Sequence, residues 1–219
     1  NLGFWVDLLR GLDCDIICLQ EVDTVERMKH LASALDRYLA PFPSPTRYAG
    51  CVLSTSPIVE TRLFNECGPR GRTGLFSRFG GAALLEIGEE RVWVVNLHLN
   101  PHDIEMRSAE GDLLARHLDT LLIVEPKAMV MGDFNCRVDE QVHELLRDRG
   151  FVNAMGRAGG GLQPTEWQGV KAIDHIYVSA ALAGRLVAAQ VVTGPGFTQD
   201  EDHPWSYSDH LPVVAELAW

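Results

Sequence analysis

Three short clusters centred on aspartate stand where apolar runs of the 219-residue chain begin or end. They are Gly132-Asp133-Phe134-Asn135, Ile173-Asp174-His175-Ile176 and Ser208-Asp209-His210-Leu211. A carboxylate at the end of a strand faces solvent on a rigid support. Several carboxylates aimed at one point repel one another unless a cation lies among them. The clusters therefore indicate a metal-dependent enzyme.

Two further polar side chains, Glu21 and His98, also follow apolar runs. Magnesium and manganese prefer oxygen ligands, bind through one or two carboxylates, and leave positions for water and a substrate phosphate. We therefore expect Glu21 and Asp209 to bind Mg²⁺ or Mn²⁺, with Asp133 near them.

Hydrolysis of a phosphodiester also needs a base for the attacking water and donors to the developing charge. Asp133 can serve as the base and Asn135 as an amide donor. His98 and His210 can donate to the non-bridging oxygens. Asp174 can accept the second N–H of His210, which orients the ring and favours its charged form.

Taken together, the motifs resemble those of the endonuclease/exonuclease/phosphatase superfamily, which has the DNase I-like fold. The matching segments, in family order, are residues 17–22, 51–58, 95–99, 132–135, 173–176 and 208–212. Each segment alone is a weak signal, but their ordered occurrence over residues 15 to 213 is a strong one. The resemblance implies a four-layer sandwich of two mixed β-sheets flanked by helices. It also implies cleavage of phosphoester bonds with magnesium or manganese.

The resemblance also assigns roles to individual residues. Glu21 and Asp209 would bind the metal, and Asp133 and Asn135 would activate water and bind the phosphate. His98 would contact the phosphate or act as an acid. Asp174 and His210 would form an Asp–His pair. The family opens with a strand that ends in an asparagine. Asn1 stands near that position, so we expect this first strand to be missing from the chain.

Periodicity predicts the elements that must position these residues. Alternating apolar residues between turns predict strands over 15–20, 51–53, 58–59, 82–87, 92–97, 128–131, 172–178, 186–193 and 211–217. Helical spacing predicts helices over 5–12, 24–39, 105–124 and 140–149, with prolines ending the second and Asp139 capping the last. With 46% hydrophobic residues, this pattern predicts one α/β domain over residues 1–219, in which mixed sheets pack face to face with helices outside.

The net charge of −11 and the isoelectric point near 5.1 argue against a protein that coats nucleic acid through a basic surface. They are compatible with a nuclease whose bound cations offset local negative charge. We expect a metal-dependent phosphodiester hydrolase that acts on DNA or RNA. Two alternatives stay open. One is a phosphatase or phosphodiesterase for a small or lipid-linked phosphate, of the inositol phosphate or sphingomyelin type, and the other is a non-catalytic binding module on the same scaffold.

No apolar run approaches the roughly 20 residues that cross a bilayer, so no transmembrane segment is expected. We expect a monomer. The sequence favours the cytoplasm as the compartment and is also compatible with secretion. The five cysteines show no spacing typical of zinc sites, and we expect buried, reduced thiols.

Two groups of residues keep two interpretations. The arginines of a glycine-rich segment, which either bind a phosphate or only solvate a loop, are Arg70, Arg72 and Arg78. The sequence favours the second interpretation, a solvated loop. The aromatic residues that either stack on a base or sugar or pack a long loop are Trp167, Phe197, Trp205 and Tyr207. His175 is expected on the opposite face of its strand from Asp174, in a structural role.

Overall fold

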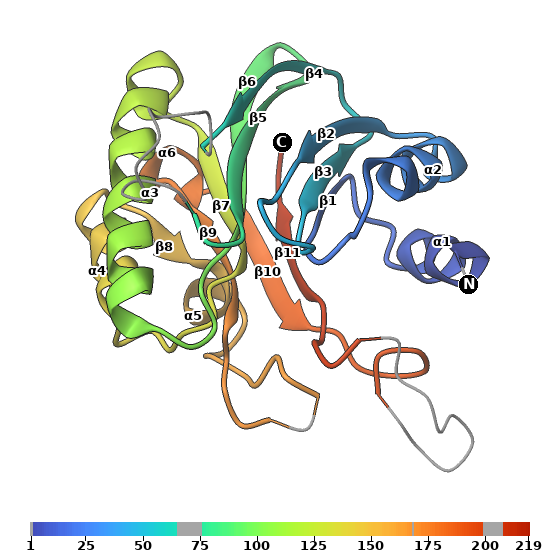
Figure 1. The fold of residues 1–219 in the computed structure, drawn as a ribbon. Coiled ribbons are helices and arrows are strands. Elements are labelled where there is room, and N and C mark those ends of the chain that lie inside the picture. Colours follow the sequence, from blue (N-terminus) through green and yellow to red (C-terminus); the bar gives the residue numbers. More distant parts are fainter. Residues whose placement is uncertain (1, 65–75, 168, 199–207) are drawn as a thin grey trace.

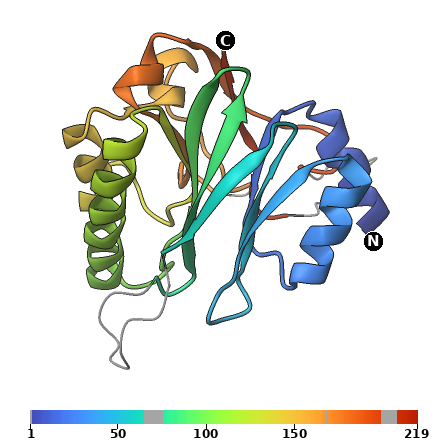
Figure 2. The same ribbon diagram turned by 90° about the horizontal axis from the view of Figure 1, so that it is seen from above.

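The computed structural model describes residues 2–64, 76–167, 169–198 and 208–219. Its elements form layers in which helices lie outside and β-sheets lie between them (Figure 1, Figure 2). The expected mixed α/β architecture is thereby confirmed. Six residues singled out in the sequence lie outside the described residues: Asn1, Cys67, Arg70, Arg72, Trp205 and Tyr207.

One inner layer is a six-stranded mixed sheet with the order β4-β5-β6-β7-β9-β8. Its strands are β4 (Ile58–Leu63), β5 (Phe79–Ile87), β6 (Glu90–His98), β7 (Ala128–Asp133), β8 (Val152–Asn153) and β9 (Asp174–Val178). Strands β6 and β7 are parallel, and α3 (Ile104–Val124) connects them, whereas the other neighbours are antiparallel. Strands β5 and β6 form a hairpin, and both extend further than the predicted strands over 82–87 and 92–97.

The other inner layer contains two antiparallel pieces. The first has the order β1-β3-β2, and the second pairs β10 with β11. Their bounds are β1 (Ile16–Leu19), β2 (Tyr38–Phe42), β3 (Gly50–Ser54), β10 (Leu186–Val191) and β11 (Val213–Leu217). Within the described ranges, β1 pairs only with β3 and β11 only with β10. Each of β1 and β11 thus has one unpaired edge in the described residues, and both strands line the same cavity.

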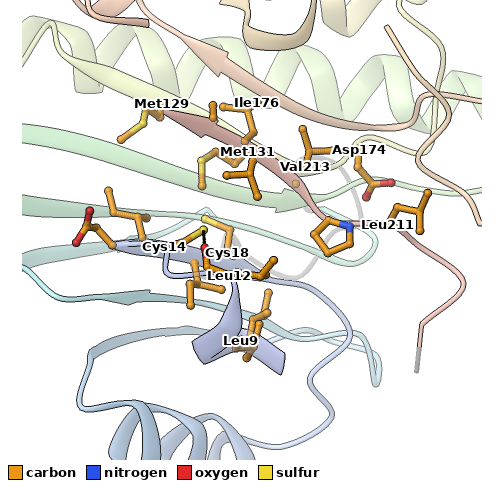
Figure 3. Close-up of a pocket in the computed structure, with 18 of the residues that line it drawn as sticks. Leu9, Leu12, Cys14, Cys18, Met129, Met131, Asp174, Ile176, Leu211 and Val213 are labelled. Carbon is orange, nitrogen blue, oxygen red and sulfur yellow. Dashed lines mark hydrogen bonds between the residues drawn. The ribbon is translucent and has the colours of Figure 1, made fainter. Parts of the chain in front are cut away.

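This cavity has a volume of about 540 Å³ and is lined by the six-stranded sheet, by β1 and β11, and by the helix at residues 2–11. Figure 3 shows Met131 and Ile176 of the six-stranded sheet on one side and Leu9 and Cys18 on the other. Asp174 lies at one end, so the cavity reaches the strand ends where the sequence predicts chemistry.

The helices cover the outer faces of both inner layers. Helices α1 (Leu2–Gly11) and α2 (Val25–Leu35) cover the three-stranded piece, and α3 and α4 (Gln141–Asp148) cover the six-stranded sheet (Figure 2). Two short helices, α5 (Ala154–Ala158) and α6 (Ala180–Ala183), flank β8 and β9 along the chain. One apolar cluster lies at each of the three layer contacts. No described helix has the length and apolarity needed to cross a membrane.

The prediction of one helix over 24–39 was wrong at its C-terminal end. The Thr24 hydroxyl caps α2, but the helix ends at Leu35, and Asp36 adopts a left-handed conformation with φ 54°. The following residues form β2, including Pro41. Proline is tolerated there because β2 is an edge strand, where a missing N–H breaks no ladder on the outer side.

Two smaller predictions also differ from the structure. The N-cap position of α4 is Glu140 rather than Asp139, and its side chain makes no capping hydrogen bond because it binds Arg107. The cysteines in the described residues are free, as expected, but Cys14 and Cys18 are only partly buried. Strand β8 and helices α5 and α6 were not predicted, because elements of two to five residues are too short to show periodicity.

Candidate active site

Three adjacent strands place three titratable side chains in one row. In the register of the six-stranded sheet, His98 of β6 lies opposite Asp133 of β7, which lies opposite Asp174 of β9. Side chains two residues apart share a face of a strand. The residues two positions before His98 and Asp133, and two after Asp174, face the other inner layer. The row therefore faces the segment after β1, where Glu21 lies.

The turn after β7 has the backbone conformations that hold Asp133 in this row. Gly132 has φ 140°, and a Cβ there would clash with the carbonyl oxygen of Leu97. Asn135 adopts a left-handed φ of 52°. Its backbone N–H donates to Asp133 Oδ1 at 2.8 Å, and its Nδ2 donates to Asp133 Oδ2 and to the Leu99 oxygen, both at 3.0 Å. The turn thus fixes both oxygens of the carboxylate.

Asp133 lies in a strongly negative environment. Its side chain is almost fully buried, and His98 Nε2 is 3.3 Å from its Oδ2. Burial, followed by the charge of Asp174 and a smaller contribution from Glu21, raises the pKa of Asp133 well above its usual range. The His210 charge and the Asn135 N–H act in the opposite direction. A positive group beside this carboxylate would therefore be strongly favoured.

Asp174 and His210 form a hydrogen-bonded pair, as the sequence predicted, with 2.8 Å between Asp174 Oδ2 and His210 Nδ1. Burial opposes a charge on His210. The hydrogen bond and charge of Asp174, with the charges of Asp133 and Asp209, outweigh it and raise the pKa of His210 to about 9. The ring is therefore an imidazolium at neutral pH.

Thr165 braces this pair from behind. Its Oγ1 accepts the backbone N–H groups of Ile173 and Asp174, each at 3.1 Å. Its carbonyl oxygen accepts the N–H of Leu211 at 2.6 Å. One buried threonine thus ties the segment of Asp174 to the segment of His210.

His98 is neutral at the same pH. Burial, followed by the charges of Arg78 and His210, lowers its pKa to about 3. The Arg78 guanidinium carbon lies 3.4 Å from the centre of the Tyr48 ring, and that ring also meets His98 edge to face at 6.1 Å. Within the described part of the chain, Arg78 Nη1 and His98 Nδ1 are buried and without a hydrogen-bond partner. These two nitrogens point to an additional polar group at this place.

Glu21 and Asp209 lie at the exposed rim of the row. Glu21 follows β1 with a left-handed φ of 57°, and Asp209 is anchored by its carbonyl oxygen, which accepts the N–H of Trp167 at 2.8 Å. The donor atoms that lie within 4.8 Å of one another belong to Asp133, Asp174 and His210. Asp174 is therefore nearer to a possible cation than the sequence predicted.

A divalent cation fits the donors present. The carboxylates are hard oxygen ligands of the kind that Mg²⁺ and Mn²⁺ prefer, and no cysteine belongs to the group of close donors in the described residues. Burial and then the charge of Asp174 raise the pKa of Asp133, so a cation bound beside it would offset both effects. The oxygens of Asp133, Glu21 and Asp209 could hold the ion, with Asp174 adjoining.

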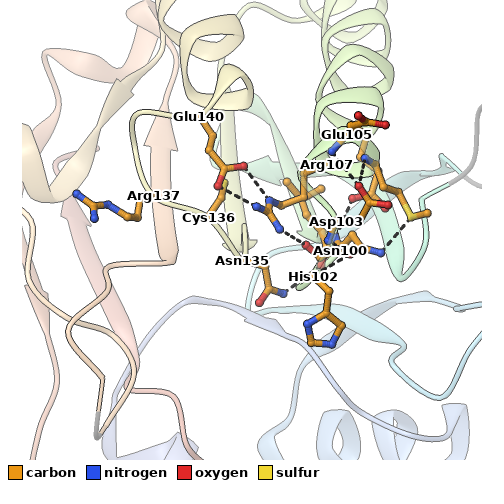
Figure 4. Close-up of polar contacts among 12 residues, drawn as sticks. Asn100, His102, Asp103, Glu105, Arg107, Asn135, Cys136, Arg137 and Glu140 are labelled. Carbon is orange, nitrogen blue, oxygen red and sulfur yellow. Dashed lines mark hydrogen bonds and ion pairs between the residues drawn. The ribbon is translucent and has the colours of Figure 1, made fainter.

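A polar network supports the loop that follows β6. Arg107 binds both oxygens of Glu140 at 2.8 and 2.9 Å and donates to the Asn100 carbonyl at 3.0 Å (Figure 4). Glu110, which is 1% exposed, accepts the backbone N–H groups of Asn100 and Ser77. Because the Leu99 carbonyl in the same loop accepts the side chain of Asn135, this network reaches the turn after β7.

Sequence reasoning assigned no role to Asn96, Thr165 or Tyr48. A signal existed for Asn96, because it interrupts the apolar inward positions of β6 after Val92 and Val94. Thr165 and Tyr48 lie outside the named strands, where no periodicity marks a buried side chain.

Two of the remaining aromatic and histidine predictions can be placed in the structure. His175 is buried and contacts Phe134 edge to face at 5.3 Å, behind the turn of Asp133. Phe197 is buried as well and lines the 540 Å³ cavity. Its packing favours the interpretation as a loop anchor over that of a stacking platform.

Comparison with known proteins gives a family and a set of similar folds. The model of the Endonuclease/Exonuclease/phosphatase family matches residues 1–210. Comparison with the curated proteins finds no match. The Bacteroides thetaiotaomicron mannosyl-6-phosphatase has 18% identity and a TM-score of 0.79, over 100% of this chain and 90% of that one.

Two further solved structures are similar to a comparable degree. A 3′ phosphatase from Neisseria, bound to a product DNA hairpin, has 20% identity and a TM-score of 0.77, over 100% of this chain and 96% of that one. The human Nocturnin catalytic domain with a bound sulfate anion has 21% identity and a TM-score of 0.72, over 98% of this chain and 84% of that one. At these identities the likeness concerns the fold alone.

Proposed function

The chain belongs to the endonuclease/exonuclease/phosphatase family, and from this premise we propose that it is a divalent-metal-dependent phosphoester hydrolase. The observation that carries the proposal is the row of His98, Asp133 and Asp174 with the paired His210. It combines a buried carboxylate, a charged imidazole and a neutral imidazole around one point. These are the groups that hydrolysis of an anionic ester requires.

Glu21, Asp209 and Asp133 would hold Mg²⁺ or Mn²⁺, which when bound supplies positive charge to a phosphate oxygen. The protein residues have separate tasks. Asp133 accepts the proton of the attacking water, and its burial makes it a stronger base than an exposed aspartate. Asn135 fixes the direction of this carboxylate through its two hydrogen bonds.

The transition state gains negative charge on the phosphate oxygens, and three side chains can stabilise it. His210 donates from its imidazolium, which Asp174 orients and keeps charged. His98 is neutral and still offers an N–H. Arg78 lies on the Tyr48 ring that meets His98, and its charge acts on His98, so we assign it to the phosphate as a nearby cation.

We propose a phosphodiester of DNA or RNA as the first substrate. The support is the similarity in fold to a 3′ phosphatase bound to a DNA hairpin, together with aromatic and cationic side chains at the site. A small phosphate ester is the second candidate. It is favoured by the net charge of −11, which opposes extended contact with a polyanion, and by the similarity to a mannosyl-6-phosphatase.

The test compares nicking of supercoiled plasmid, hydrolysis of bis-(p-nitrophenyl) phosphate and release of phosphate from mannose 6-phosphate. Each assay is run with Mg²⁺, with Mn²⁺ and with chelator, and an Asp133→Asn variant prepared in parallel controls for contaminating enzymes. Metal-dependent nicking that the variant lacks supports a nuclease. Ester cleavage without nicking supports the second candidate, a small phosphate ester, over DNA or RNA. If all assays stay silent with either metal, the proposal of metal-dependent hydrolysis of these phosphoesters fails.

A further inference from the structure

A buried amide lies directly beneath the row of catalytic side chains. Asn96 is 0% exposed and occupies the position of β6 two residues before His98, facing the other inner layer. Its Nδ2 donates to the carbonyl oxygens of Leu19 at 3.0 Å and Cys51 at 2.9 Å. Its Oδ1 accepts Gln20 Nε2 at 2.8 Å. Both acceptors are carbonyls, so the orientation of the amide is fixed.

These three bonds join the two inner layers at one point. Leu19 ends β1 and Cys51 lies opposite it on β3, whereas Asn96 belongs to the six-stranded sheet. In the described part of the chain, Asn96 makes all side-chain hydrogen bonds between β1 or β3 and that sheet. An apolar residue of similar size would remove all three bonds and would leave Gln20 Nε2 without this acceptor. The amide therefore contributes directly to the way these layers meet.

The segment that Asn96 holds is the one that presents Glu21. Glu21 has a left-handed φ of 57°, which a residue with a side chain adopts only when its neighbours are fixed. Leu19 and Gln20 are fixed on one side by Asn96, and the Val22 N–H is fixed on the other by the Ala49 carbonyl at 2.9 Å. Removing the Asn96 bonds would release one side of this restraint.

We propose that Asn96 is a positioning residue for divalent-cation binding, because its amide holds the end of β1 so that Glu21 faces Asp133. This inference rests on the proposed function, since it takes Glu21 as a metal ligand. Groups that orient ligands in this way typically contribute 10- to 100-fold to metal affinity. Asn96 itself touches neither the metal nor the substrate in this account.

The test measures Mn²⁺ binding by calorimetry or electron paramagnetic resonance, without substrate and at a temperature where every variant is folded. Asn96→Asp keeps the shape of the side chain and removes both donors. Gln20→Met removes only one of the three bonds and serves if the first variant does not fold. We expect the Mn²⁺ dissociation constant to rise by at least about tenfold for Asn96→Asp and about threefold for Gln20→Met.

Ser179→Ala is the matched control, because it also removes a buried hydrogen bond to a strand, from the Ala128 N–H at the opposite end of β7. It should lower the melting temperature and leave Mn²⁺ affinity unchanged. A double-mutant cycle with Glu21→Gln separates positioning from general damage. If Asn96 acts through Glu21, its effect on affinity disappears in the Glu21→Gln background.

Two results would overturn the inference alone. One is unchanged Mn²⁺ affinity in folded Asn96→Asp and Gln20→Met, and the other is an equal loss of affinity with and without Glu21. Absence of Mn²⁺ binding by the parent protein would overturn both this inference and the metal-dependent function.

Discussion

At the scale of single residues, the site combines groups whose charge states are set by their neighbours. Asp174 keeps His210 charged, whereas burial beside Arg78 keeps His98 neutral. Two imidazoles on one site thus have different tasks, because their pKa values are shifted in opposite directions. The sequence predicted both histidines as donors, but it could not predict this difference, which depends on burial and distance.

Arg78 gives a prediction at this scale. Arg78→Ala should raise KM for a phosphoester about tenfold or more, because it removes a cation assigned to the phosphate. Arg78→Lys should recover only part of this loss, since lysine lacks the planar group that stacks on Tyr48. Steady-state kinetics on one substrate measures both effects.

Arg91→Ala is the control, because Arg91 pairs with Glu86 at the exposed end of the β5–β6 hairpin. Its KM should match that of the parent. If Arg78→Ala also keeps the parental KM, the side chain has no part in substrate binding.

At the scale of elements, the turn after β7 depends on a close approach of two strands. Gly132→Ala should destabilise the protein by about 3 kcal/mol or more, because its Cβ would clash with the Leu97 carbonyl at φ 140°. Gly160→Ala is the matched control, since Gly160 also has a positive φ, of 75°, but open space around it. Its cost should be only about 1 kcal/mol. Urea unfolding gives both values, and equal costs would refute the close approach.

His143 of α4 gives a pH-dependent prediction. It stacks on Phe134 at 5.0 Å and its Nδ1 lies 2.8 Å from the Tyr177 hydroxyl. Burial, then the charges of His175 and Arg147, lowers its pKa from 6.5 to about 3. The stability linked to this neutral ring is complete above pH 6.5 and is lost as the pH falls towards 3.

Lowering the pH from 7 to 5 should therefore reduce the free energy of unfolding of the parent protein by about 2 kcal/mol through His143. His143→Phe keeps a ring against Phe134 and cannot titrate, so its stability should fall by about that much less over the same interval. Denaturant unfolding at both pH values measures the difference. Parallel pH dependence of the two proteins would show that His143 is not buried in the neutral form.

Sequence reasoning predicted most elements but not how they meet. Strand–turn patterns gave β5, β6 and β7 with His98 and Asp133 at their ends, because their alternation and apolar runs are long. The predicted helix over 24–39 continued into β2 because the residues after Leu35 carry no strong breaker before Pro41. Asn96 bonds to Leu19, which is 77 positions away in the sequence, and to Cys51, which is 45 positions away, and no local pattern shows such contacts.

At the scale of the whole molecule, charge constrains the way a polyanion can bind. The chain has a net charge of −11, and Arg78 and the His210 imidazolium are the two cationic side chains assigned to a phosphate in the described site. Few phosphate contacts release few counterions. If DNA is the substrate, a plot of log kcat/KM against log salt should have a slope no steeper than about −2. A slope near −5 or beyond would reveal a basic contact surface that the account lacks.

The most direct test of the central claim is the rate of phosphoester hydrolysis by Asp133→Asn with saturating Mn²⁺, on whichever substrate the parent cleaves. The variant keeps the size of the side chain and loses the base, so we predict a fall in kcat of about 10²- to 10⁴-fold with an unchanged melting profile. His175→Ala, altered next to Asp174 but away from the proposed chemistry, should keep most of the parental kcat. Parental turnover by purified Asp133→Asn would contradict the account.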